Sequence, residues 1–238
     1  MLLKKFLCSV AVTAALALVM QGGEAKADAT ITASYELNGG ALTALTNSTG
    51  LPDVFVSQAI PPLTIGNFTF NSLSGFTQPT SNPNVLQVTA LDSHSNPVGT
   101  PTGVNVTDTL QLFFVSTGLT PGGALTFLSQ FASNATGNGL SVTEKTYLGL
   151  PPGPGTPLGS VSFPPLLGTG AITTDASPAS GYILTAEIDI TATGKQSSST
   201  SITVTAVPGP IVGAGLPGLI AACGGLLALA RRRRKRAA

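Results

Sequence analysis

The sequence predicts an all-β fold, an antiparallel β-sandwich or a jelly roll, flanked by an N-terminal signal helix and a C-terminal transmembrane helix. Short apolar runs alternate with polar residues at a period of two, which is typical of half-buried strands. Thr, Ser, Gly, Pro and Asn fill the intervals between them, as in all-β extracellular domains. Both ends of the chain are apolar. These observations divide the chain into residues 1–27, 28–206 and 207–238.

Residues 1–27 are predicted to be a secretory signal peptide. Two lysines precede an apolar run over residues 6–20, which is short for a membrane span. Small residues stand at Ala25 and Ala27 in the small-x-small pattern that signal peptidases cut, and we expect cleavage before Asp28. The alternative is an N-terminal anchor helix. A cleaved signal implies the Sec export machinery as a partner.

Residues 28–206 form the exported part, with a size that suits one domain or two small sandwiches. This part contains no cysteine, so disulfides and thiol chemistry are excluded. Its bases are Lys145 and Lys195 alone against nine acids, a net charge of about −7. An acidic surface repels phosphate backbones, so we expect no nucleic-acid partner.

Alternation predicts nine or ten strands in this part. Residues 104–116 are apolar on both faces and should form a central strand. Residues 125–132 fit a strand or a helical turn equally well. Prolines make 150–157 a surface loop or an edge crossing, because proline donates no ladder hydrogen bond. The other expected strands are 31–37, 54–56, 68–70, 85–91, 140–148, 161–163, 171–173, 182–193 and 201–206.

The clearest alternation lies in residues 182–193. Leu184, Ile188 and their even-numbered neighbours should face the core, and Thr185, Glu187 and Asp189 should face outward. Glu187 and Asp189 are the calcium candidates, because calcium needs only oxygen ligands, and Asp108 or Asp175 would complete the site. The alternative is a solvated outer sheet face. With one histidine and no exported cysteine, the sequence indicates no other metal or cofactor.

No residue is predicted to be catalytic. His94 lies in the polar segment 92–97, which we expect to be a solvated loop, and no Gly-x-Ser-x-Gly motif accompanies it. Paired carboxylates would suit a glycoside hydrolase, but nine acids always supply some pair. Flat aromatic platforms for sugars are scarce, since the chain has three tyrosines and no tryptophan.

Residues 207–238 read as a sorting tail with three parts. Val207, Pro208, Gly209 and Pro210 form a proline-rich start. Residues 211–230 are uncharged, and as a helix they would span about 30 Å, the thickness of the hydrocarbon core. Six cations follow and should stop translocation on the cytoplasmic side, with the exported part outside: Arg231, Arg232, Arg233, Arg234, Lys235 and Arg236.

This tail resembles the PEP-CTERM sorting domain of Gram-negative bacteria in the order of its three parts. One position departs from the family pattern, because Gly209 stands where an acidic residue is usual. The resemblance implies a substrate of an exosortase-type membrane protease. Such a protein is exported, held briefly in the inner membrane, cut near the proline signature, and delivered to the cell surface or its exopolysaccharide. The alternative is a permanent C-terminal anchor.

Three functions remain open from the sequence. The first is a non-enzymatic structural or adhesive protein of the cell surface or exopolysaccharide. The second is a calcium- or carbohydrate-binding module, and the third is a hydrolase. They differ in what they require: a stable domain without turnover, a cluster of ligand groups, or a cleft with convergent polar groups and perturbed pKa values.

Overall fold

The computed structural model describes residues 29–57, 62–78, 84–97, 103–120, 123–136, 138–150, 155–164 and 167–208. In these residues the chain forms strands β1 (Thr30–Leu37), β2 (Thr43–Ala44), β3 (Val54–Val56), β4 (Leu63–Ile65), β5 (Phe68–Gln78), β6 (Asn84–His94), β7 (Thr107–Leu119), β8 (Leu125–Thr136), β9 (Leu140–Leu148), β10 (Thr156–Phe163), β11 (Leu167–Ala176), β12 (Tyr182–Thr193) and β13 (Gln196–Pro208). None of the described residues forms a helix long and apolar enough to cross a membrane. The predicted signal helix and transmembrane helix lie outside the described residues.

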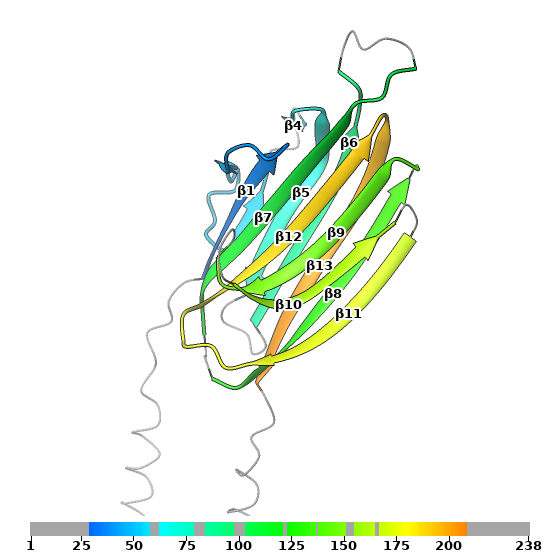
Figure 1. The fold of residues 1–238 in the computed structure, drawn as a ribbon. Coiled ribbons are helices and arrows are strands. Elements are labelled where there is room, and N and C mark those ends of the chain that lie inside the picture. Colours follow the sequence, from blue (N-terminus) through cyan, green and yellow to red (C-terminus); the bar gives the residue numbers. More distant parts are fainter. Residues whose placement is uncertain are drawn as a thin grey trace, which may run out of the picture.

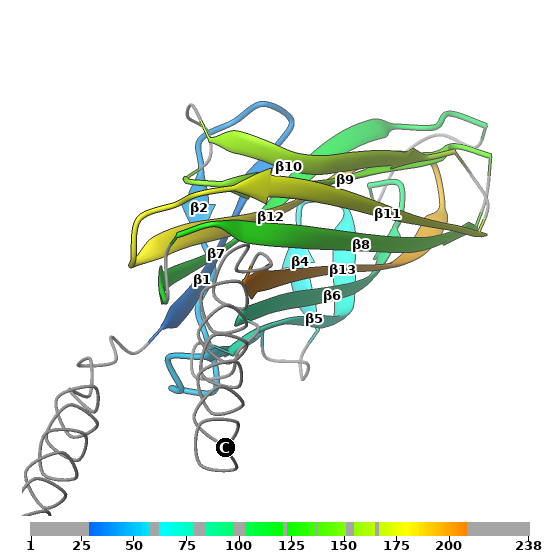
Figure 2. The same cartoon turned by 90° about the horizontal axis from the view of Figure 1, so that it is seen from below.

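The strands make two antiparallel sheets that face each other (Figure 1). Sheet A has the order β10-β9-β12-β7-β1-β2. Sheet B has the order β11-β8-β13-β6-β5-β3, and β4 also pairs with β5. The all-β, antiparallel prediction is confirmed, and β7 lies inside its sheet as its two apolar faces predict. Figure 2 shows the two layers from below.

The long strands are wound as a jelly roll. The hairpin β9–β10 forms the centre of the winding, and around it β8 pairs with β11, β7 with β12, and β6 with β13. These nested antiparallel pairs alternate between the two sheets, which is the jelly-roll arrangement of eight strands. β1 and β2 extend sheet A beyond β7, and β5 with β3 and β4 extends sheet B beyond β6.

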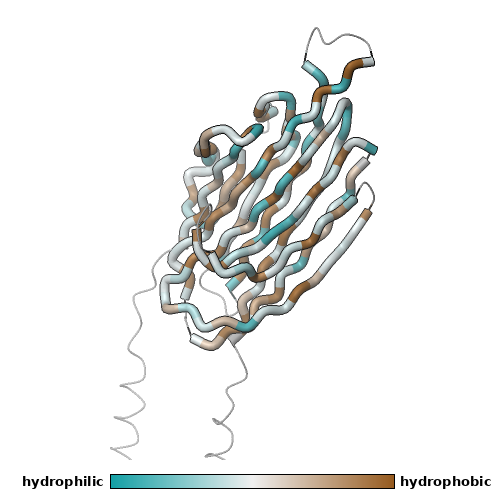
Figure 3. The backbone as a smooth tube through the Cα atoms, viewed as in Figure 1, coloured by the Kyte–Doolittle hydropathy of each residue, from teal (hydrophilic) through white to brown (hydrophobic). Residues whose placement is uncertain are grey.

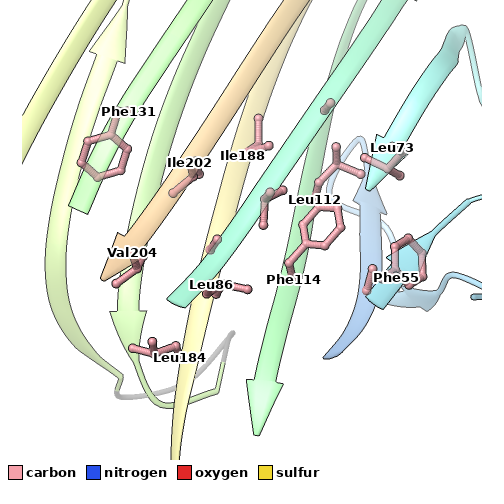
Figure 4. Close-up of a cluster of buried hydrophobic side chains, with 14 of the residues drawn as sticks. Phe55, Leu73, Leu86, Leu112, Phe114, Phe131, Leu184, Ile188, Ile202 and Val204 are labelled. Carbon is pink, nitrogen blue, oxygen red and sulfur yellow. The ribbon is translucent and has the colours of Figure 1, made fainter. Parts of the chain in front are cut away.

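The core lies between the inward faces of the two sheets (Figure 4). Leu112, Phe114 and Ile188 of sheet A meet Leu86 and Ile202 of sheet B, and each of these side chains is fully buried. Phe55 and Phe114 pack edge to face, with ring centroids 5.7 Å apart. Apolar and polar residues alternate along the strands, as the tube in Figure 3 shows. The strand pairs of the described residues run from Thr30 to Pro208.

The two sheets come close together where β10 and β11 face each other. A Cβ added at Gly170 would lie 2.8 Å from a Val161 methyl group, and one at Gly168 would lie 2.3 Å from the Phe163 ring. Only glycine allows these side chains of β10 to reach the backbone of β11. Thr174 Oγ1 also donates to the Leu158 carbonyl at 2.7 Å.

Two strand ends differ from the sequence prediction. β6 continues through Asp92 and His94, which were expected in a loop, because their polar side chains find partners inside the sandwich. β13 begins at Gln196 and continues through Val207 and Pro208, past the boundary predicted after residue 206. Val207 pairs with Thr126 of β8. A proline at a strand end is tolerated because the ladder needs no further donor there.

The undecided and weak segments are also strands. Residues 125–132 belong to the twelve-residue strand β8, which the two neighbouring strands β11 and β13 hold in the extended form. The segments 161–163 and 171–173 are parts of β10 and β11. The proline-rich segment enters β10 at Thr156 and Pro157, and β10 is an edge strand, as the prolines predicted. β2 and β4 were not predicted.

Candidate functional site

The calcium candidates Glu187 and Asp189 lie on the outer face of sheet A and contact a lysine. Lys145 on β9 lies beside both residues of β12, with its Nζ 2.8 Å from Glu187 Oε1 and 2.5 Å from Asp189 Oδ2. Gln111 of β7 donates to Asp189 Oδ1 at 3.0 Å. The ammonium group therefore occupies the position between the two carboxylates that a calcium ion would need.

Partial burial and mutual contact set the pKa values of this network. Burial alone would lower the pKa of Lys145, but hydrogen bonds to Asp189 and Glu187 outweigh it and raise that pKa. Burial raises the pKa of Glu187 against the opposing effect of Lys145. Burial and the charge of Glu187 raise the pKa of Tyr147 to about 12. The lysine stays charged, and its ammonium group is bound to Glu187 and Asp189 of the same network.

Asp108 and Asp175 do not join this network. Asp175 lies on β11 in sheet B, where it accepts a hydrogen bond from Thr126 Oγ1 at 2.7 Å. Asp108 lies at the start of β7 and belongs to the group around His94. Among the residues that the structure describes, no three potential metal ligands of the His, Cys, Asp or Glu types lie together.

His94 is buried at one end of the sandwich, so the prediction of a solvated loop residue is wrong. Its Nε2 lies 2.9 Å from Asp108 Oδ2, and its Nδ1 lies 2.5 Å from the Gly194 carbonyl oxygen. Asn38 and Asn67 donate to the two oxygens of Asp108. Burial alone would raise the pKa of Asp108, but these hydrogen bonds outweigh burial and lower that pKa. The group joins five turns and strand ends by hydrogen bonds within the sandwich.

Two carboxyl groups point into the interior of the sandwich. Glu144 on β9 is fully buried, and among the described side chains its carboxyl oxygens have no hydrogen-bond partner. Burial raises its pKa to about 8. Asp92 on β6 accepts a hydrogen bond from Ser198, and burial raises its pKa to about 6. Raised pKa values of this kind suit acid catalysis only where a substrate has access. Both groups are sealed from solvent.

The outer face of sheet A is more covered than predicted. Thr185 was expected to point to solvent, but it is fully buried, and its Oγ1 donates to the Gly149 carbonyl at 2.6 Å. Phe113 and Val115 of β7 point to the same outer side, yet they are only 3% and 9% exposed. This face therefore has little free apolar surface.

The outer face of sheet B is open and has a different chemistry. Strand register places five outward side chains side by side across five strands, and we call them the sheet B row: Ala171 of β11, Gln130 of β8, Thr203 of β13, Gln87 of β6 and Phe76 of β5. Four strand spacings of about 4.8 Å make the row about 19 Å long.

A shallow hollow of about 480 Å³ lies over one half of this row. Its lining combines hydroxyl and amide groups with small apolar ones: Gln130, Phe131, Ala132, Thr169, Gly170, Ala171, Ser201 and Thr203. At the other end of the row Phe76 is 37% exposed, and Leu91 on the neighbouring strand is 40% exposed. Asp175, at a corner, is the one charged residue among the described outward side chains of this face.

A second hollow, of about 430 Å³, lies between β2 and β4 at the opposite side of the sandwich. Tyr35, Leu45, Leu63 and Ile65 supply its apolar lining, and Thr43 and Ser57 supply hydroxyl groups. It is bounded by two- and three-residue strands. We regard the sheet B row as the stronger candidate site, because it is longer and carries an exposed aromatic ring.

The predicted processing residues are mostly outside the described residues. Ala25, Ala27 and Asp28 of the signal cleavage site lie there, and so do residues 209–238 of the tail. Val207 and Pro208 are described as the end of β13. The sheet B row was not predicted, because its members come from five segments that no motif connects.

No protein-family model and no curated protein matches the chain. Among solved structures, TmCBM61 in complex with beta-1,4-galactotriose matches 71% of this chain and 86% of its own, at 8% identity and a TM-score of 0.27. A CBM4 structure matches 73% and 95%, at 13% identity and a TM-score of 0.30. The infectious bursal disease virus Gt strain matches 77% and 52%, at 15% identity and a TM-score of 0.29. TM-scores below 0.5 identify neither the family nor the function of this chain.

Proposed function

We propose that this chain is an exported, non-enzymatic adhesive protein that binds a neutral polysaccharide at the cell surface. The observation that carries the proposal is the sheet B row, which combines an uncharged hollow with an exposed aromatic ring. An exposed aromatic ring offers a partner a large and rigid apolar surface. The row is about 19 Å long by strand spacing, which suits an extended chain molecule.

The chemistry of the row matches a neutral sugar chain. Hydroxyl groups of Thr203 and Ser201 both donate and accept hydrogen bonds, and so does the amide of Gln130. Sugar hydroxyl groups have the same dual capacity, and the C–H faces of sugar rings suit apolar contacts with Ala171 and Phe76. A net charge of about −7 on the exported part would repel anionic polymers.

Several features support a non-catalytic role. A hydrolase needs a carboxyl pair or a nucleophile at an accessible cleft. Glu144 and Asp92 have raised pKa values but are buried, and the row itself carries no titratable group. Calcium has no place in the proposal, since Lys145 Nζ already lies between Glu187 and Asp189.

The location of the protein is proposed from the sequence. The signal peptide would direct it to the Sec machinery, and the tail would hold it by one span with the exported part outside. An exosortase-type protease would then cut near Val207–Pro210 and release the domain to the surface or the exopolysaccharide. The span over 211–230 is rich in glycine and contains a proline, which suits a transient anchor.

Affinity electrophoresis tests the binding proposal. Residues 28–208 would be run through gels that contain neutral glucan, galactan, mannan or xylan, and through gels with anionic alginate or polygalacturonate. We expect retardation by at least one neutral polymer and none by the anionic ones. Equal mobility in all gels, or retardation by the anionic polymers alone, would contradict the proposal.

Cell fractionation tests the sorting proposal. The full chain and a Pro208→Ala/Pro210→Ala variant would be followed by immunoblot through membrane, surface and medium in a host with the processing enzyme. We expect the parent to leave the membrane and the variant to accumulate there uncut. Release of both at the same rate would mean that the prolines are not the signal. A parent that stays in the membrane would indicate a permanent anchor.

A further inference from the structure

The four sheet edges differ in how they are protected against pairing with another chain. β2 and β3 end their sheets with two and three residues. β10 carries Pro157 and a register shift next to it. Short strands, prolines and bulges are the usual protections of an edge. β11 has none of them: it is ten residues long, contains no proline or lysine, and follows β8 without a break.

The side chains of β11 are also open to solvent. Leu167 at its start is 77% exposed, the highest value among the large apolar residues of the described chain. Thr169, Ala171 and Thr173 are exposed along its outer side. Asp175 is the one charged residue in the strand. A long, regularly paired and nearly uncharged edge is a template for strand addition.

We propose that two copies of this chain pair along β11, antiparallel and about a two-fold axis through Ala171. The pairing joins the two sheets B into one continuous sheet. A two-fold axis perpendicular to the sheet keeps the outer faces on one side, so outward residues must oppose outward residues. The register about Ala171 meets this condition and opposes Thr169 with Thr173.

This register avoids charge repulsion and does not place two identical bulky side chains on the axis. Asp175 of one copy opposes Leu167 of the other, so no two charges meet. On the inner side, Ile172 opposes Gly170, which has no side chain, so no two branched side chains oppose each other there. The register shifted to Ile172 would oppose two bulky side chains on the axis instead. Self-complementarity of this kind favours a second copy over an unrelated strand.

The dimer would also affect polysaccharide binding, and this part of the inference alone rests on the proposed function. Thr169, Gly170 and Ala171 line the hollow of the sheet B row and lie on the edge that pairs. Two hollows therefore meet at the two-fold axis and form one groove to which both copies contribute residues. Two linked sites on one polymer bind with an avidity above that of each site alone.

Disulfide trapping tests the pairing on residues 28–208, which contain no cysteine. Directly opposed residues of antiparallel strands lie within disulfide range. Ala171→Cys should give a covalent dimer under mild oxidation, and Ser201→Cys on the same face but away from the edge should not. Light scattering should show a concentration-dependent dimer of the unsubstituted protein. A monomer at every concentration, or a dimer that Ala171→Cys fails to trap, would overturn the proposal.

Charge exchange tests the register. Ala171→Lys and Ala171→Asp should each raise the dissociation constant of the dimer at least ~10-fold, and an equimolar mixture should restore pairing. Both variants should keep the circular dichroism of the parent. A mixture as monomeric as its components would overturn the register. Capture of a synthetic 167–176 peptide by a domain that stays monomeric would show that the edge takes an extended peptide instead.

The experiments on the dimer are carried out without polysaccharide. Failure of pairing would therefore leave the glycan proposal standing, and failure of glycan binding would leave the dimer standing.

Discussion

The two outer faces of the sandwich differ in charge and in the exposure of their aromatic side chains. On sheet A, the outward aromatic Phe113 is 3% exposed, and the charges of Lys145, Glu187 and Asp189 are bound to one another. On sheet B, the outward aromatic Phe76 is 37% exposed, and the row around it is uncharged. The charged groups of sheet A are bound to one another, so they stabilise this face rather than contact a partner. An open, neutral face with an exposed ring is free to bind one.

The first way to sharpen this comparison is pH, since the groups whose pKa values are raised lie inside the sandwich or on sheet A. The carboxyl of Glu144 has an ordinary pKa of 4.5 and a pKa of about 8 in the fold. The folded chain keeps a proton that the unfolded chain has lost, so the contribution of Glu144 to stability is highest at low pH and falls as pH rises from 4.5 to about 8. Asp92 adds the same sign between 3.8 and about 6. We expect denaturant titrations to give roughly 4 kcal/mol more stability at pH 5 than at pH 8.

The control for this prediction is Glu144→Gln, which removes the titrating group and keeps its shape. Its stability should change much less between pH 5 and pH 8 than that of the parent. Asp108 works in the opposite direction, because its pKa is lowered, but its contribution is lost only below its ordinary pKa of 3.8. Stability that rises from pH 5 to pH 8 would contradict the account.

The same substitution on both faces comes next. Thr185→Asp on sheet A would bury a charge and lose the hydrogen bond to the Gly149 carbonyl, at a cost of about 3 kcal/mol. Thr203→Asp on sheet B enters a half-exposed position and should cost less than about 1 kcal/mol. Thermal and denaturant melts of the two variants measure the difference. Equal losses of stability would mean that the two outer faces are buried to the same extent at these positions.

Lys145→Met should have the next largest effect. It leaves Glu187 and Asp189 side by side without their cation, and Glu187 is nearly buried. We expect a loss of about 2 kcal/mol, less than for a fully buried pair because the lysine is 27% exposed. Adding Glu187→Gln and Asp189→Asn to the same variant should recover part of the loss. No loss in the single variant would show that the network is only a surface contact.

The smallest effect should come from calcium. Because the Lys145 ammonium lies between the two carboxylates, the melting temperature of residues 28–208 should be the same with calcium and with a chelator. Differential scanning calorimetry measures it. A clear rise of the midpoint with calcium would revive the calcium-binding alternative.

The sequence predicted the strands with clean alternation, such as β1, β9 and β12, and the inward side of β12. It failed where distant segments decide the outcome. Asp92 and His94 looked like loop residues, because their polar groups are satisfied by partners from distant segments, Ser198 for Asp92 and Asp108 with the Gly194 carbonyl for His94. Thr185 looked exposed, because alternation predicts which face of the sheet a side chain lies on but not whether other residues bury it there. The sheet B row depends on the register of five strands, and no single segment encodes it.

The most direct test of the central claim compares one aromatic residue from each face. Isothermal titration calorimetry would use an oligosaccharide of the neutral polymer that retards the parent, with Phe76→Ala and Tyr147→Ala variants of residues 28–208. Phe76→Ala should weaken binding on the order of tenfold, because the exposed ring at the end of the row is lost. Tyr147→Ala, on the closed face, should bind like the parent. Parental affinity of Phe76→Ala together with weakened binding by Tyr147→Ala would place the glycan on sheet A and contradict the account.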